Sequence, residues 1–297
     1  MLEKTAIEDS AGALTDEDEL PPISDRVITI RPASRLPHLD LHELWQYREL
    51  AATFAWRDLK VRYKQSLIGG AWAIIQPVMT MVVFTFIFGT FAKVPSQGLP
   101  YPVFSYSGIL PWTYFAGALG AASGSLAMNS SLLTKIYFPR VLLPLAAVTV
   151  PVVDFLLACT VLGGLMGYYG LSVGFHALLA PLFMFLAATT ALGVGLVFSV
   201  INVRYRDVPY AIPFIIQIWL FLSPVIYPIK ALHQSWERLI LSLNPMSGVI
   251  TGFRWSLLGT PPPSALQLVL SIAAACAFLT FGITVFRRSE PRFADTI

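Results

Sequence analysis

Four basic side chains within eight consecutive positions are the residues best suited to binding a ligand. They are Arg57, Lys60, Arg62 and Lys64. Each base beside an anionic membrane surface adds about 1 kcal/mol of binding. Two interpretations stay open. The bases only anchor a helix at the membrane surface, which composition alone favours, or they also receive a phosphate-bearing lipid head on its way into the protein.

Several motifs that would indicate an enzyme or a nucleotide site are missing. None of the six lysines follows a glycine, so there is no G-x-x-x-x-G-K-[ST] loop to hold a phosphate, and H-E-x-x-H does not occur. We therefore expect a non-catalytic chain with no metal site and no bound cofactor. If the chain is part of an ATP-driven pump, ATP and Mg²⁺ bind to another polypeptide.

Two other functional classes remain as alternatives. An ion-coupled secondary transporter usually has several ionisable residues inside its spans and internal repeats, neither of which is evident here. A membrane-embedded lipid-linked glycan transferase would need an acid or a histidine at the interface, where His176 and Asp207 are the candidates. The net charge of +3 gives no indication of nucleic-acid binding.

The composition indicates that lipid surrounds most of the chain. Of the residues, 56% are hydrophobic and 12% are charged, against roughly 25% charged in soluble proteins. So much apolar surface does not fit inside one water-soluble domain of this size. We predict an all-α integral membrane fold.

Stretches without charge predict six transmembrane helices, since each needs about 20 apolar residues. They lie near 67–91, 104–128, 141–169, 177–201, 208–229 and 264–286. Asp154 interrupts the third span, where a structural role is favoured over a transport role. Glycines 117, 120 and 124 of the second span and 163 and 167 of the third have the spacing of close helix contacts.

Three further segments complete the predicted organisation. Residues 1–38 form an acidic, disordered cytoplasmic tail, and residues 39–66 form an amphipathic interfacial helix before the six-span domain of 67–297. On that helix an apolar stripe containing Trp45 and Ala52 lies opposite Arg57. Between spans five and six, a short helical hairpin broken at Asn244-Pro245 is expected in the outer interface.

The distribution of Lys and Arg predicts the orientation. With the N-terminus inside, twelve of these residues flank the cytoplasmic ends of the spans, and Lys93, Lys230, Arg238 and Arg254 lie on the opposite side. The positive-inside rule then places both termini in the cytoplasm.

Four stretches resemble a known family, the ABC-2 type permeases that export polysaccharides such as O-antigen, capsule and teichoic acid. They are LWQYRELAATFAWRDLKVRYKQSLIGGAWAIIQPVMTMVVFTFIFG, KIYFPRVLLP, NVRYRDVPYAIPF…FLSPVIYP and NPMSGVITGFRW. The resemblance runs from about Leu41 to the C-terminus. It implies a bacterial cytoplasmic (inner) membrane protein in which two permeases pair with two separate ATP-binding cassette subunits. The implied substrate is a polysaccharide linked to undecaprenyl diphosphate.

The same resemblance implies that the loop after span two contacts the ATPase. In this sequence the loop is Asn129–Arg140, where Ser130 or Ser131 is suited to cap a short helix and apolar side chains follow. Such a surface indicates a partner or a membrane contact. The predicted coupling residues are Ser131, Leu132, Leu133, Thr134, Lys135, Ile136, Tyr137, Phe138 and Arg140.

Aromatic rings pack on the C–H faces of sugars, so a glycan conduit between two permeases is expected to be lined by them. The candidate conduit residues are Phe84, Phe88, Trp112, Tyr114, Trp219 and Phe221. A gate is predicted at Pro224, Tyr227 and Pro228, because each proline frees a carbonyl and permits a bend. In the alternative, the span merely ends there.

Overall fold

The structure of the chain is a computed structural model. It describes residues 41–64, 69–133, 138–205, 207–229 and 235–293. Within these residues all regular elements are helices, so the predicted all-α class is confirmed. The predicted acidic tail, residues 1–38, lies outside the described residues.

The predicted interfacial helix consists of two pieces, α1 (Leu41–Gln46) and α2 (Arg48–Lys64), separated by a turn at Tyr47. The side chains of these two helices differ in how far they are buried. Phe54 of α2 is buried against the bundle, whereas Trp45 and Ala52 of the predicted apolar stripe are exposed. The predicted stripe is therefore divided, because Leu44 and Ala55 of the same stripe pack with Phe54 on the bundle.

Four helical segments are long and apolar enough to cross a membrane, by length and composition. The first enters through the 3-10 turn η1 (Gly69–Ala71), continues as α3 (Trp72–Phe84) and ends in the π-helical η2 (Thr85–Phe91). The others are α6 (Leu142–Tyr168), η3 (Phe175–Leu179) with α7 (Ala180–Arg204), and α11 (Ala265–Ser289). These four correspond to predicted spans one, three, four and six.

The other two predicted spans have a different character. Helix α4 (Tyr101–Met128) has 28 residues and no charge, but its many Ser, Gly and Tyr residues keep it outside the strongly apolar group. Helix α8 (Val208–Phe221) is apolar but has 14 residues, and the chain leaves the helix at Leu222. Because α4 is covered by protein along most of its length, its surface need not be as apolar as one that faces lipid.

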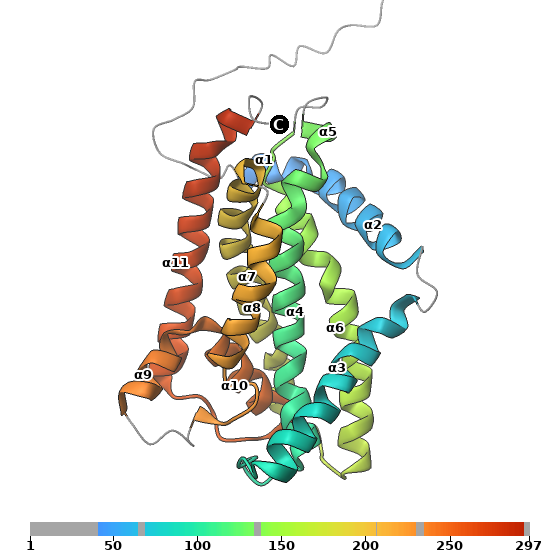
Figure 1. Cartoon of the computed structure of the whole chain (residues 1–297), viewed down its shortest axis with the longest axis vertical. Helices are drawn as coiled ribbons and strands as arrows, with labels where there is room; N and C mark the ends of the chain where they lie inside the picture. Colours follow the sequence, from blue (N-terminus) through green and yellow to red (C-terminus); the bar gives the residue numbers. More distant parts are fainter. Residues whose placement is uncertain (1–40, 65–68, 134–137, 206, 230–234, 294–297) are drawn as a thin grey trace, which may run out of the picture. The chain divides into compact units, whose positions relative to one another are not determined.

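Helix α4 is the centre of the packing. It contacts α6 and α7, and α7 contacts α11 on its other side (Figure 1). Two glycines of α7 make these contacts close. A Cβ at Gly195 would lie 2.6 Å from the Cβ of Ala122 on α4, and one at Gly193 would lie 2.5 Å from the backbone nitrogen of Leu279 on α11.

The predicted glycine contacts of spans two and three are mostly wrong within this chain. A Cβ at Gly120, Gly163 or Gly167 would meet nothing within 4 Å, and one at Gly117 would make only an ordinary contact with Pro151. Spacing along one helix does not say whether a partner helix faces those glycines. The close approaches lie instead on α7 and on the helices that contact it.

The predicted hairpin is present as α9 (Ser235–Leu243) and α10 (Pro245–Leu258), and its break is where the sequence indicated. Asn244 caps α10 by accepting a hydrogen bond from the backbone N–H of Met246 at 3.0 Å. The burial of Arg254 was not predicted. Its side chain is 1% exposed, because α10 packs against α4, α7 and α11 instead of lying at the surface.

We expect Gly282→Ala to destabilise the chain. The new Cβ would lie 2.1 Å from the carbonyl oxygen of Gly193, so α7 and α11 must separate, and overpacking of this kind lowers the free energy of unfolding by about 1–3 kcal/mol. Thermal unfolding in detergent measures the loss. Gly120→Ala is the matched control, because its Cβ meets open space and alanine favours the helix. Equal loss in both variants would contradict the close packing of α7 on α11.

Candidate functional site

The predicted coupling loop is described at its two ends. After α4, Asn129 leads into the single turn α5 (Ser130–Leu133), and the chain is described again from Phe138. Thr134, Lys135, Ile136 and Tyr137 lie outside the described residues. Leu133 and Phe138, expected on an exposed apolar surface, are buried at 7% and 4% exposure. Leu132 is half-buried and Ser131 is exposed.

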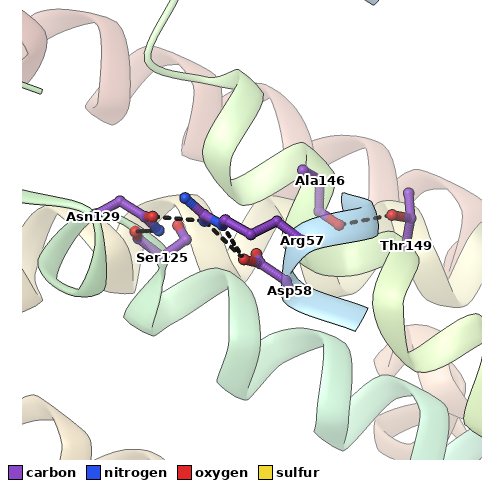
Figure 2. A network of polar contacts seen from close by, with 6 residues as sticks. All are labelled: Arg57, Asp58, Ser125, Asn129, Ala146 and Thr149. Atoms are coloured by element: carbon purple, nitrogen blue, oxygen red, sulfur yellow. Dashed lines mark hydrogen bonds and ion pairs between the residues drawn. The ribbon is translucent and has the colours of Figure 1, made fainter. Parts of the chain in front are cut away.

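Helix α2 contacts both ends of this loop. The Nη2 of Arg57 donates to the Oδ1 of Asn129 at 2.7 Å, and the Nδ2 of Asn129 donates to the carbonyl of Ser125 at 2.8 Å (Figure 2). At the other end, the rings of Phe54 and Phe138 pack with centroids 5.4 Å apart. We name the contacts of Phe54, Arg57, Asn129 and Phe138 the α2–loop junction.

Asp58 and α6 surround the junction. The Oδ1 of Asp58 accepts from the Nε and Nη2 of Arg57 at 2.9 and 2.7 Å, which fixes the plane of the guanidinium. The backbone of Ala146 on α6 lies close by in the same view, where its carbonyl accepts from the hydroxyl of Thr149 (Figure 2). Arg57 is therefore held in one orientation toward Asn129.

The loop end is also attached to the C-terminal end of α11. The Nη1 of Arg140 donates to the carbonyl of Glu290 at 2.5 Å, and its guanidinium carbon lies 5.7 Å from the ring centroid of Phe293. Glu290 begins the 3-10 turn η5 (Glu290–Arg292) and pairs with Arg287 at 3.1 Å. Two separate helices thus hold the region where the loop returns to the bundle.

A second polar group joins α2 to α6. The Nη2 of Arg62 lies 2.6 Å from the Oδ2 of Asp154, and the hydroxyl of Tyr63 donates to the Oδ1 of the same carboxylate. Burial first, and then the hydrogen bond to Asp154, raises the pKa of Tyr63 to about 12. Tyr63 is therefore protonated at neutral pH and acts as a donor.

A cavity of about 360 Å³ opens beside this group, between α2, α3, α4 and α6. The side chains of Arg62, Tyr63 and Asp154 line one part of it, and Trp72 and Gln76 of α3 line another. The cavity therefore combines one cation with polar and aromatic walls, at the place where α2 and α3 diverge in the fold (Figure 1).

The four predicted lipid-binding bases are not equivalent. Arg57 and Arg62 turn toward the protein, with side chains 39% and 47% exposed. Lys60 and Lys64 are exposed, and the ammonium of Lys60 lies 5.6 Å from the ring centroid of Trp56. Of these four bases, only the two arginines donate to acceptors outside α2. The pattern of basic residues in the sequence did not indicate this difference.

The candidate conduit aromatics lie in separate places. Phe84 and Phe88 pack edge to face at 5.7 Å and are half-buried. Trp112 and Tyr114 belong to the buried core, 6% and 4% exposed, and Tyr114 also lines the cavity between α2, α3, α4 and α6.

The two aromatics of α8 have different surroundings. Trp219 donates from Nε1 to the Oδ1 of Asn244 at 2.9 Å and is half-buried, whereas Phe221 is 54% exposed. Within the described residues the rings of Phe84 and Phe88 pack directly, Trp112 and Trp219 both pack on Phe115, and Phe221 lies apart from this cluster.

The predicted gate lies in the non-helical residues 222–228, which we name the break segment. Pro224 and Pro228 are buried, and the hydroxyl of Tyr227 donates to the carbonyl of Phe221 at 3.1 Å. Arg254, which the sequence analysis considered only as a charge that sets the orientation, donates to this segment. A single charge in the otherwise uncharged α10 was the signal that could have identified it.

One further pattern has no matching structure. Residues 170–174 read G-L-S-V-G, the G-x-S-x-G of a serine-hydrolase nucleophile elbow. Such an elbow joins a strand to a helix, but here the pattern lies between α6 and η3 in a described region that contains helices only, and Ser172 is exposed. The pattern therefore does not indicate a catalytic serine.

Several long apolar helices around a central α4 define a multi-pass membrane protein. The chain belongs to the ABC-2 type transporter family, whose model matches residues 49–258. The resemblance seen in the sequence is thereby confirmed.

The relatives include three proteins named for glycan export. The O-antigen export system permease protein RfbA of Myxococcus xanthus is 29% identical over 86% of this chain and 98% of its own. RfbA of Klebsiella pneumoniae is 25% identical over 81% and 92%, and the polysialic acid transport protein KpsM of Escherichia coli is 21% identical over 79% and 91%. All three names describe transport and none describes a catalyst.

We expect a double-mutant cycle to measure the Arg57–Asn129 contact. Arg57→Ala and Asn129→Ala should together lower the free energy of unfolding less than the sum of the single variants, with a coupling of about 0.5–1.5 kcal/mol. Denaturant unfolding in detergent gives all four values. Lys60→Ala paired with Asn129→Ala is the control and should be additive, because Lys60 contacts Trp56 instead. A zero coupling for Arg57 would contradict the junction.

Proposed function

We propose that this chain is the membrane subunit of a bacterial inner-membrane exporter that moves a polysaccharide linked to undecaprenyl diphosphate. The family and the names of the relatives support the class of substrate. In this proposal six segments cross the membrane, α4 and α8 with the break segment included, and both termini are cytoplasmic. The α2–loop junction is the observation that carries the proposal, because it joins the interfacial helix to the loop expected to meet an ATPase.

Two copies of the chain pair with two ATP-binding subunits in this proposal, and ATP and Mg²⁺ bind to those subunits. The sequence supports a separate ATPase because it has no phosphate-binding loop of the G-x-x-x-x-G-K-[ST] type. The surface offered to the ATPase is narrower than the sequence suggested. Leu133 and Phe138 are buried, so Ser131 and Leu132, together with residues 134–137, make the contact.

The junction gives a route for movement. A push on the loop displaces Asn129 and Phe138, and both contact α2 directly. Since a helix moves as a nearly rigid body, α2 then shifts at its far end, where Arg62 and Tyr63 hold Asp154 of α6. ATP hydrolysis would in this way change the cavity between α2, α3, α4 and α6.

The coupling proposal predicts that Arg57→Ala lowers the amount of glycan exported per ATP hydrolysed. Loss of one contact along a coupled element changes coupling by about 0.5–2 kcal/mol, or roughly 2- to 30-fold. The measurement uses the chain copurified with its ATPase and reconstituted in proteoliposomes. Lys60→Ala is the matched control on the same helix.

A separate variant tests the loop itself. Tyr137→Asp should reduce ATPase activity of the complex, and Phe138→Asp is unsuitable because Phe138 is buried. Unchanged ATPase turnover with Tyr137→Asp would contradict the loop contact. Labelling of a cysteine at position 137 from outside the cell would contradict both the loop contact and the orientation.

The cavity beside Arg62 is proposed to accept the phosphate-bearing head of the lipid carrier. Arg62 is half-exposed there and its partner Asp154 is 15% exposed, so an incoming phosphate competes with the carboxylate for the same guanidinium. Arg62 and Arg57 then have different tasks, binding for the first and coupling for the second. Lys60 and Lys64 remain as anchors to anionic lipid.

This assignment predicts opposite effects of two variants. Arg62→Gln should raise the concentration of undecaprenyl phosphate required for half-maximal ATPase stimulation by about tenfold, the range for loss of a charged hydrogen bond. Asp154→Asn should lower that concentration, because the competing charge is removed. A purely structural role of the pair predicts reduced stability for both variants and no such change of sign.

The conduit is proposed to lie between two copies of the chain, with Phe84, Phe88 and Phe221 as its aromatic contacts. Phe221 is exposed, and Phe84 and Phe88 are half-buried, so a second copy or a sugar has access to them. The break segment forms the outer gate in this arrangement. Normal export by Pro224→Ala and Pro228→Ala would leave the gate without support.

A further inference from the structure

The break segment has a problem that follows from its two prolines. In a continuing helix the carbonyl of Pro224 would accept a hydrogen bond from the N–H of residue 228, but Pro228 has no N–H. The helix ends at Phe221, so the carbonyls that follow also lose their helical donors. Since residues 223–226 are buried, these carbonyls need donors from the protein.

Side chains supply the missing donors. The carbonyl of Leu222 accepts from the Nδ2 of Asn244 at 2.9 Å, and that of Ile226 accepts from the hydroxyl of Tyr101 at 2.9 Å. Three carbonyls lie between them: that of Ser223 accepts from the backbone N–H of Val225 at 2.7 Å, and those of Pro224 and Val225 accept from Arg254 at 3.3 and 3.1 Å. Arg254 is thus the donor at the centre of the segment.

Arg254 also joins the segment to α4. Its Nε donates to the hydroxyl of Ser107 at 3.2 Å and its Nη2 donates to the carbonyl of Phe104 at 3.1 Å. The guanidinium carbon lies 3.8 Å from the ring centroid of Phe104, a cation–π contact. In the described part of the chain Arg254 forms no ion pair with a carboxylate. Neutral oxygens and one aromatic ring surround the buried charge.

Gly108 of α4 leaves room for this arrangement because it has no side chain. A Cβ at Gly108 would lie 2.5 Å from the Nη2 of Arg254 and 3.0 Å from the carbonyl oxygen of Val225. No other residue type leaves space for both the guanidinium and the break segment against α4. Gly108 is therefore a second, independent sign that the three parts fit together at this point.

We propose that Arg254 is the positioning residue of the break segment. It replaces the backbone donors that the prolines remove and holds Pro224 and Val225 against α4. On the basis of the proposed function, the outer end of the permease opens only when these hydrogen bonds break. Lysine is a poor substitute, because one ammonium does not reproduce the planar fork that serves two segments at once.

Accessibility of Val225 tests the positioning without any need for transport. The full chain is prepared with Cys159 and Cys276 replaced by serine and with Val225→Cys as a reporter, and is labelled in detergent with a water-soluble maleimide. Val225 is 0% exposed, so the parent should react slowly. Arg254→Lys, which keeps the charge, should raise the labelling rate at least about tenfold, since hydrogen bonds to a charged group each contribute a factor of this order.

Two glycine variants separate positioning from general loosening. Gly108→Ala should speed labelling as Arg254→Lys does, and the two changes together should be less than additive because they disturb one contact. Gly248→Ala is the control on α10, since its Cβ would crowd α11, 2.4 Å from the hydroxyl and 2.6 Å from the Cβ of Ser271, and would meet no part of the break segment. Equal labelling in the parent and Arg254→Lys overturns the proposal, as does equal acceleration by Gly248→Ala.

Export by the reconstituted complex then distinguishes this inference from the proposed function. Faster labelling with altered export supports both the positioning and the gate. Faster labelling with unchanged export supports the positioning by Arg254 and contradicts the gate. Unchanged labelling contradicts the positioning whatever the export rate.

Discussion

Backbone and charged groups inside a bilayer have no water to bind, and this constraint determines how the end of the fold that contains the break segment is built. Helix α8 ends after 14 residues, so the next carbonyls need other donors. Asn244 and Arg254 provide them, and both belong to the segment around α10. The short hairpin therefore has to pack into the bundle, because a hairpin at the surface would leave the break segment without partners.

The same constraint acts at the opposite end through α2. Asp154 lies within α6 and is an expensive charge there, yet Arg62 and Tyr63 reach it from α2. This pair fixes one end of α2, while Phe54 and Arg57 fix its middle to the loop. A helix attached at two points transmits displacement from one to the other, so the polar partners that make the fold possible also connect the loop to the cavity.

Local patterns predicted local features. Charge-free stretches predicted the long helices, and Asn244-Pro245 predicted the break before α10, because capping and helix length depend on neighbours in the sequence. Contacts between distant residues were not predictable in this way. Arg57 meets Asn129 across 72 positions, and Gly193 meets Gly282 on another helix. The burial of Arg254 was not predicted, because a count of charges between spans does not say whether the segment that carries them folds inward.

The arginines and lysines near the inner end have different roles, although the positive-inside rule counts them alike. Arg57, Arg62 and Arg140 each donate to an oxygen on another helix or turn, whereas Lys60 and Lys64 are exposed. The planar guanidinium suits fixed acceptors and the ammonium suits a hydrated surface. The residues that the positive-inside rule counts thus include those that hold α2 and the loop in place, and the rule alone does not separate them from the exposed lysines.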